Sequence, residues 1–395
     1  MLASPKNYII PVVVAFFNVL LILFPGDIVD AARGGLLLWF NNVLPALLPF
    51  IIGTNVLAAV GFVRLMGRLL DPVMLSLFRV PGAGGFALVT GMMSGYPMGA
   101  KTAATLVQSG HISAPSAWRL AAFCNNSGPL FMLGAVGAGL FSNAGIGYFI
   151  MFCHYAGAIA VGLVLARFSS KSEAAKRPAH RDENNTPVYG GREVTLRPKP
   201  FGEVLGTSVK NAMETVVVVG GYIVLFAVIV RIFDILGLFE VSLVLARPVL
   251  EPLGIDAALL SGVLVGMVEM TNGAWRLSEA GVSAQSISAL TFVISFGGFS
   301  IHAQSVSFLS KAGVSGGKYI AGKLMHAVTS ASLAFVSFGL FGLTSSEASP
   351  VFFQPSAPII RVFGYSSALF LISMLGLIIT AVLCRIIFRR RRRRY

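Results

Sequence analysis

Two long stretches of this chain repeat the same order of features: a prolyl turn, an apolar hairpin opened by Gly-Met, and an apolar segment interrupted in its middle by small residues. In the first stretch the marks are Pro72, Gly91 with Met92, Gly110 and the break at 125–129. In the second they are Pro248, Gly266 with Met267, Gly281 and the break at 295–299. Interrupted apolar segments at matching positions in two halves are typical of transporters, whose binding sites form at such breaks. The repeat therefore predicts a helical membrane protein with two related halves.

The composition agrees with a polytopic membrane protein, because 55% of the residues are hydrophobic and only 12% are charged. A helix needs about 20 mostly apolar residues to cross a bilayer. By that rule we expect about eight crossings, at 8–24, 34–61, 116–140, 146–166, 209–232, 287–310, 320–343 and 362–388. Glycine and proline interrupt two further apolar stretches, 85–108 and 257–280, near their centres. Each is therefore predicted to be a re-entrant hairpin of two short helices.

The formal net charge of +14 is concentrated beside membrane segments, in the loop 167–199 and the tail 389–394. Basic clusters in such places indicate cytoplasmic loops and contacts with anionic lipids, and not nucleic-acid binding. Both termini are then cytoplasmic. The residues expected on the cytoplasmic side are Lys6, Arg64, Arg68, Arg79, Arg119, Lys311, Lys318 and Lys323. Those expected on the opposite side are Asp27, Asp30, Arg33, Arg231, Asp234, Glu240, Arg247 and Arg361.

This topology places the start of the first hairpin, after Arg79, on the cytoplasmic side and the start of the second, after 250–252, on the opposite side. The fold class is therefore predicted to be an all-α inverted repeat with two re-entrant hairpins and two discontinuous helices. The segments 62–80 and 235–250 are expected to lie at the membrane interface, and the inversion fails if either crosses. The expected parts are an N-terminal helix and loop (1–33), a first repeat (34–167), a basic cytoplasmic linker (168–204), a second repeat (205–345), and a C-terminal helix with a polybasic tail (346–395).

The first repeat supplies two groups of candidate substrate-binding residues. The hairpin tip contributes Ser94, Gly95, Tyr96 and Lys101, and the break contributes Asn125, Asn126, Ser127 and Gly128. Lys101 lies in the first turn of the second short helix, where an ammonium and free backbone N–H groups favour an anion. The alternative is that Lys101 extends to the cytoplasmic interface. The amides of the break can donate and accept hydrogen bonds, although such residues also join neighbouring membrane helices.

The second repeat supplies a further set of candidates: Thr271, Asn272, Gly297, Gly298, Ser300, His302 and Gln304. Glu269 lies deep in an apolar stretch, so it is the candidate for coupling to H⁺ or Na⁺; alternatively it forms a salt bridge with Lys101 or Arg276 that only locks the hairpin. Phe296 and Phe299 could sandwich a flat ring. His302 could carry a proton or bind an anion, or serve packing alone.

The sequence motifs do not support an enzymatic function. The sequence lacks H-E-x-x-H, the G-x-S-x-G elbow and a P-loop, and its acids and histidines do not have metal-ligand spacing. We therefore expect no catalytic residues, no metal site, no cofactor and no ATP-driven pumping.

Two motifs in the first half, residues 91–101 and 123–129, resemble the sporulation integral membrane protein family of YlbJ or SpoVV type. These proteins carry paired nucleoside-recognition Gate domains related to concentrative nucleoside transporters. The resemblance extends from about residue 34 to 341, more loosely in the second half, at 269–273 and 297–304. It implies a role in endospore formation in a Gram-positive bacterium. It also implies transport of dipicolinate, a flat aromatic dicarboxylate, from the mother cell across the outer forespore membrane.

The residues and the resemblance together predict a secondary carrier that moves a small aromatic anion by alternating access. The half-helix ends, Lys101, the amides and the phenylalanine rings suit a planar dianion. The alternatives are a transporter of nucleosides or other small solutes, and a membrane scaffold that organises partners in sporulation without transport. Self-association into a homo-oligomer is compatible with either.

Overall fold

The computed structural model describes residues 6–168, 180–181, 187–188, 200–250, 252 and 256–341. The predicted crossing at 362–388, the polybasic tail and most of the basic linker lie outside these residues. The described chain is helical apart from one pair of two-residue antiparallel strands, β1 (His180–Arg181) and β2 (Pro187–Val188).

The first half of the chain contains a run of short and long helices. They are α1 (Lys6–Leu23), α2 (Pro25–Leu38), the π-helix η1 (Trp39–Val43), α3 (Leu44–Ala59), α4 (Phe62–Leu77), α5 (Gly84–Ser94), α6 (Met98–Gln108), α7 (Ala114–Cys124), the π-helix η2 (Leu130–Leu140) and α8 (Ala144–Arg167). The stretch 85–108 is divided into two short helices, as predicted. The break after Cys124 is likewise present, because α7 ends there and η2 begins at Leu130.

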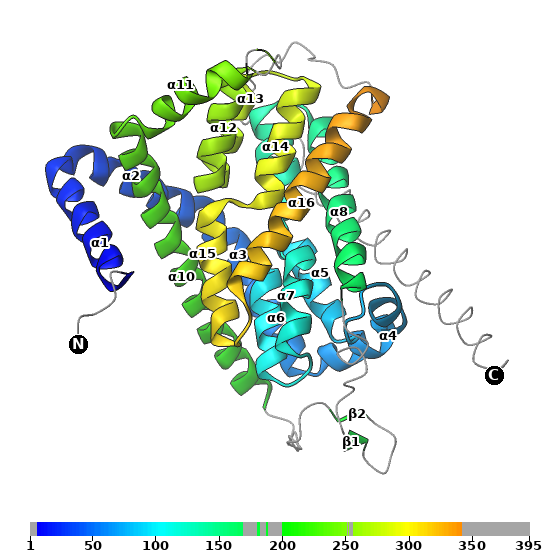
Figure 1. The fold of residues 1–395 in the computed structure, drawn as a ribbon. Coiled ribbons are helices and arrows are strands. Elements are labelled where there is room, and N and C mark those ends of the chain that lie inside the picture. The colour runs from blue at the N-terminus through cyan, green and yellow to red at the C-terminus, as the bar shows by residue number, and fades with distance from the viewer. Residues whose placement is uncertain are drawn as a thin grey trace.

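The second half has the same order of elements. It contains α10 (Phe201–Ile235), α11 (Leu238–Leu250), α12 (Ala257–Val268), α13 (Met270–Glu279), α14 (Ala284–Phe296), α15 (Gly298–Lys311), α16 (Gly316–Ser337) and the 3₁₀-helix η4 (Phe338–Phe341). The pair α12–α13 corresponds to α5–α6, and the broken helix α14–α15 corresponds to α7–η2. Figure 1 shows α5, α6 and α7 towards one end of the molecule and α12, α13 and α14 towards the other.

Seven of the eight predicted crossings fall within the described residues, and the structure has fewer apolar spans there. Four helical segments are long and apolar enough to cross a membrane: Ala144–Arg167, Phe201–Ile235, Ala284–Lys311 and Gly316–Leu340. A fifth crossing is present if the pair formed by Pro11–Leu23 and Pro25–Asn41, bent by 102°, counts as one span. The expected span 34–61 is divided by η1, and 116–140 is divided by the first break. The described residues therefore contain four or five apolar spans, which is fewer than predicted.

The helices α4 and α11 contain 16 and 13 residues and are too short to cross a bilayer. Each connects the preceding helix, α3 or α10, to the hairpin of its half. Figure 1 shows the two helices near opposite ends of the molecule. Their position at the membrane interface stays a prediction.

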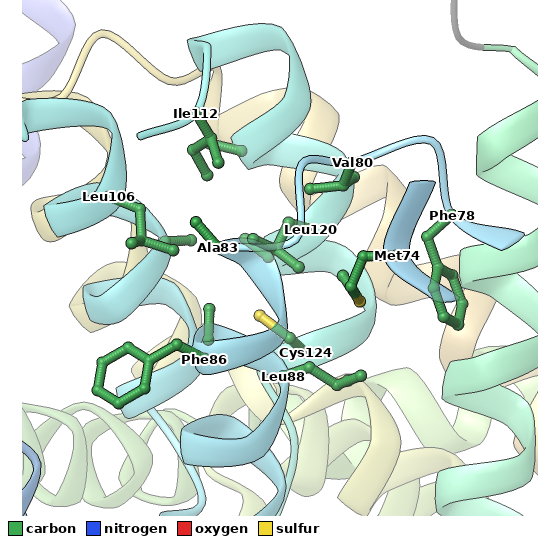
Figure 2. Packing of buried hydrophobic residues seen from close by; sticks show 14 of the residues in the cluster. Met74, Phe78, Val80, Ala83, Phe86, Leu88, Leu106, Ile112, Leu120 and Cys124 are labelled. Carbon is green, nitrogen blue, oxygen red and sulfur yellow. The ribbon is translucent and has the colours of Figure 1, made fainter. Parts of the chain in front are cut away.

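The core is divided into two main clusters, and each one draws on both halves of the chain. The first lies around α4, α5, α6 and α7 and includes Leu309 of α15. Figure 2 shows its side chains gathered around the first hairpin, with Cys124 among them. The second lies around α8, α12, α13 and α14 and includes Met132 and Val136 of η2. Each broken helix thus has one part in each cluster, which places both breaks at the boundary between them.

Glycine allows the second break to pack closely on the hairpin of its own half. Gly297 and Gly298 have φ values of +89° and +70°, a conformation that residues with a Cβ rarely adopt. A Cβ on Gly298 would lie 2.9 Å from the carbonyl oxygen of Gly266 and 3.2 Å from the backbone nitrogen of Met270. The first break has the same relation to its hairpin, since a Cβ on Gly128 would lie 3.2 Å from the carbonyl oxygen of Ser94.

Candidate functional site

Tyr96, at the tip of the first hairpin, connects that hairpin to the second break. Its hydroxyl donates to the carbonyl oxygens of Ile294 and Ser295, at 3.1 Å each. These carbonyls belong to the last turn of α14, where the break removes the usual helical N–H donors. The hydroxyl therefore satisfies groups that the break exposes. The first hairpin tip, the first break and the second break consequently meet at one place.

Asn125 joins the first break to helices of the second half. Its side-chain oxygen accepts from the backbone nitrogen of Ala100 at 3.2 Å, so the amide also holds the start of α6. Its Nδ2 donates to Ser305 Oγ at 2.9 Å and to Tyr319 OH at 2.7 Å. Because both amide ends are used, Asn125 is a fully bonded residue of the boundary between the two halves.

His154 of α8 lies between the two breaks and contacts both. Its Nε2 accepts from the backbone nitrogen of Ser127 at 3.1 Å, and its Nδ1 lies 2.8 Å from Ser295 Oγ. The neighbouring Tyr155 donates to the carbonyl oxygens of Met92 and Ser127 at 2.7 and 3.1 Å. Buried polar groups are stable when they are paired in this way. The imidazole thus forms a direct bridge from one unwound segment to the other.

Lys323 of α16 lies in the middle of this polar cluster with no exposed surface. Its ammonium donates to the carbonyl oxygen of Asn125 at 2.9 Å and to His326 Nδ1 at 2.8 Å. The same ammonium lies 5.0 Å from the centroid of the Tyr96 ring, within cation–π range. In the part of the chain that the structure describes, no carboxylate pairs with Lys323. A buried cation without an acidic partner is costly unless an anion can join it.

Several buried polar atoms near the breaks have no hydrogen-bond partner among the described residues. They are Ser94 Oγ, Asn126 Oδ1 and both ring nitrogens of His302. The His302 ring instead contacts aromatic rings, with centroid distances of 4.4 Å to Phe296 and 5.5 Å to Tyr319. Unpaired buried polar atoms are uncommon in folded proteins and are available to a polar ligand. Here the unpaired atoms occur in the same region as the aromatic rings and the buried ammonium of Lys323.

Lys101 is partly buried beside α10. Its ammonium donates to Thr215 Oγ1 at 2.5 Å, and the Thr215 hydroxyl donates in turn to the carbonyl oxygen of Asn211. The side chain therefore turns towards α10, on the flank of the hairpin, and does not extend freely to the interface. It supplies a second positive charge near the first hairpin tip.

Glu269 caps the second short helix of the other hairpin. Its two carboxylate oxygens accept from the backbone nitrogens of Thr271 and Asn272, at 3.1 and 2.8 Å. Within the described residues it forms no ion pair with Lys101 or with Arg276, which binds Asp234 at 2.9 Å. Glu269 and Asn272 line a cavity of about 410 Å³ between α2, α10 and α13. These two candidates therefore face a different space from the buried lysine.

The remaining candidates lie along α15 and at the glycines. Ser300 and Gln304 are buried and bond to each other at 3.4 Å, one turn apart. Gly95 lies against Gly128, and Gly297 lies beside the Tyr96 ring. All of these positions adjoin the meeting point of the breaks, whereas Glu269, Thr271 and Asn272 belong to the cap of α13.

Sequence reasoning missed the residues at the centre of the cluster: His154, Tyr155, Tyr319, Lys323 and His326. Lys323 was placed among the cytoplasmic charges, and the structure corrects this by burying it completely. Arg119 is also buried, beside the carbonyl oxygen of Arg79. One signal could have indicated the lysine, because Lys323 and His326 are one helical turn apart in an otherwise apolar segment.

Two similarities to known proteins bear on the function of this polar cluster. Residues 40–168 match the Gate family, described as nucleoside recognition. The sporulation integral membrane protein YlbJ of Bacillus subtilis (strain 168) is 37% identical over 324 residues, which are 80% of this chain and 79% of YlbJ. The chain belongs to the YlbJ family of sporulation integral membrane proteins. The family resemblance predicted from the motifs is thus confirmed. No solved structure matches the chain.

Membership of the YlbJ family and the apolar helices together show that the chain is an integral membrane protein, and its residues 40–168 match the Gate family. The Gate match begins in η1 and ends at the end of α8. It contains the first hairpin, the first break and His154, but not Lys323 or His326. The second half of the polar cluster is therefore supplied by a part of the chain that the Gate match does not cover.

Proposed function

We propose that this YlbJ-family protein is a secondary carrier that moves a small, flat aromatic anion by alternating access. The observation that carries this proposal is the buried ammonium of Lys323, which has aromatic rings beside it and no acidic partner among the described residues. An anion that binds there gains the attraction of a charge held in a place of low dielectric constant. The site takes no part in covalent chemistry, so the protein is not an enzyme in this proposal.

An inverted repeat is the architecture that best explains the shared cores. The part of each broken helix that precedes the break packs with its own hairpin, and the part that follows packs with the hairpin of the other half. This exchange is what two copies with opposite orientation in a membrane produce. In such a carrier the two re-entrant hairpins approach the midplane from opposite sides, and rocking of the halves opens the site to each side in turn.

Dipicolinate is the substrate that we propose, on three grounds. Its planar ring suits the faces of Phe296 and Tyr319, its negative charge suits Lys323, and the relative YlbJ is named a sporulation protein. We place its transport across the outer forespore membrane. A nucleoside is the alternative favoured by the Gate description, but a nucleoside does not call for a buried cation.

The proposal also includes a coupling ion and contacts with membrane lipids. Glu269 is the candidate for coupling to H⁺ or Na⁺, because its carboxylate lies beside the cavity between α2, α10 and α13. The basic loop and the basic tail are proposed to contact anionic lipids. Replacing Glu269 by glutamine should then remove the dependence of transport on the coupling ion.

Transport assays with site variants test this function. In proteoliposomes we expect uptake of labelled dipicolinate, with uptake reduced about tenfold or more in Asn126→Ala and Ser127→Ala, since each loses about 1–2 kcal/mol of ligand bonding. The exposed Asn211→Ala in α10 is the matched control and should retain wild-type uptake. Normal uptake by both variants would show that these residues do not form the binding site. Uptake of uridine without uptake of dipicolinate would favour the nucleoside carrier.

A second experiment separates the carrier from the non-transporting scaffold. Deleting residues 171–199 and 389–394 removes the basic segments through which a scaffold would hold its partners. A carrier should keep its transport in proteoliposomes after these deletions. A scaffold should instead lose its role in sporulation while showing no transport in either form.

A further inference from the structure

When Lys323 is an ammonium, the hydrogen bonds around it define which nitrogens of the two neighbouring histidines donate and which accept. An ammonium can only donate, so His326 Nδ1 accepts from Lys323, and the imidazole N–H is at Nε2, which donates to the carbonyl oxygen of His154 at 2.8 Å. His154 Nε2 accepts from the backbone nitrogen of Ser127, which places its N–H at Nδ1, facing Ser295 Oγ. With Lys323 as the cation of the cluster, both imidazoles are therefore neutral in this arrangement.

The titratable groups that face this cluster come from the first hairpin tip and from α7, α8, α15 and α16, whereas α14 supplies none. They are Tyr96 from the first hairpin tip, Cys124 from α7, Tyr155 from α8, His302 from α15 and Tyr319 from α16. None of them is a carboxylate or a second lysine or arginine. Lys101, the other lysine near the first hairpin tip, is turned towards α10, where its ammonium donates to Thr215. A dianion placed beside Lys323 would thus leave one negative charge uncompensated in a site closed to water, at a high cost in free energy.

We propose that His326 is a proton-binding site, and that each aromatic dianion bound at Lys323 is accompanied by one proton taken up from water. This inference rests on the proposed carrier function and deepens it. A substrate carboxylate would accept the Lys323 N–H that now points at His326 Nδ1. The freed nitrogen then takes a proton from bulk water and donates it, as an N–H, to the same carboxylate. No bond within the substrate forms or breaks, and the bound charges sum to zero.

The position of His326 also links this proton to the two breaks. Its Nε2 is bonded to the carbonyl of His154, and the His154 ring joins the backbone of Ser127 to the side chain of Ser295. A change of charge at His326 therefore acts on the residue that connects the two unwound segments. Binding of the anion and the proton would therefore change contacts in both halves of the carrier.

Calorimetry on the purified full-length protein tests the proton uptake directly. Dipicolinate is titrated near pH 7 in phosphate and in Tris, which release different heats when they give up a proton. We expect the two apparent enthalpies to differ by the amount that corresponds to one proton per bound anion. Equal enthalpies would overturn the inference and leave the carrier function standing, whereas absence of dipicolinate binding in both buffers would overturn the carrier function itself.

A pair of variants assigns the proton to a residue. His326→Gln keeps a side-chain acceptor for Lys323 but cannot become a cation, so it should bind dipicolinate about tenfold more weakly, with proton uptake near zero. His111→Gln is the matched control, because His111 lies beyond the end of α6, where its Nδ1 is 2.7 Å from Ser109 Oγ, and it should keep the wild-type proton uptake. Undiminished proton uptake by His326→Gln would contradict the assignment, as would its loss in His111→Gln alone. The wild-type comparison in two buffers decides the uptake even if His326→Gln does not fold.

Discussion

Replacing Lys323 by methionine should reduce dipicolinate transport by about 100-fold, because losing the buried charge partner of a bound anion costs about 3 kcal/mol. Methionine has a similar length and fills the same volume, so the packing of α16 is kept. The substitution removes the donor to Asn125 and His326 together with the positive charge. Initial rates of labelled uptake in proteoliposomes, corrected for the amount of folded protein, measure the effect.

Lys318 provides the matched control for this experiment. It lies on the same helix but is exposed, with its ammonium 6.0 Å from the centroid of the Trp118 ring. Lys318→Met should change the rate by no more than about twofold, since surface substitutions rarely exceed 0.5 kcal/mol. Equal transport by Lys323→Met and wild type would remove Lys323 from the binding site. A folded Lys323→Met protein that loses transport, beside an unaffected Lys318→Met, would support it.

The second large effect is expected at Gly91, where the first hairpin contacts the end of α7. A Cβ added there would overlap the carbonyl oxygen of Cys124 and would lie 2.9 Å from its carbonyl carbon and 3.0 Å from Gly99 Cα. These are backbone atoms, which cannot turn away as a flexible side chain can. Gly91→Ala should therefore destabilise the fold by about 3 kcal/mol and lower the midpoint of thermal unfolding by about 5 °C.

Gly53 in α3 is the control for the effect of alanine itself. No atom lies within 4 Å of a Cβ added at Gly53, and alanine favours a helix over glycine. Gly53→Ala should therefore leave the midpoint unchanged or raise it slightly. The comparison is made on purified protein in one detergent by thermal unfolding. A Gly91→Ala protein as stable as Gly53→Ala would show that the hairpin does not pack on the first break as tightly as described.

Much of the helical order could be predicted from local chemistry. The division of 85–108 into short helices follows from Gly95 and Pro97, which lie between α5 and α6. In 257–280 the break instead falls at Glu269, whose side chain caps α13, and the flanking glycines lie inside the two helices. The break before Leu130 follows from five consecutive residues that disfavour a helix. The number of crossings was overestimated because hydropathy counts apolar residues. It does not detect the π-helix η1 or the 102° bend between the first two helical segments.

The roles of the charged residues could not be predicted as well. Lys323 lies seven residues after the start of α16, a position that hydropathy treats as the flank of a span. Whether such a lysine reaches the interface or the interior depends on which helices surround it. The surrounding helices here are α7, α8 and α14, and their placement is not written in the local pattern. Arg276 likewise binds Asp234, which is 42 residues away, and not the nearer Glu269.

The interrupted apolar segments and the composition, taken by themselves, indicated that this chain is a helical membrane protein. Helix breaks are local events, set by a few adjacent residues and by the need of each backbone group for a partner in lipid. Which polar side chains meet at those breaks was decided only by the tertiary structure. Asn125 and Tyr319 are 194 residues apart and bond at 2.7 Å. Such a contact depends on how two cores pack together, and no spacing along the chain encodes it.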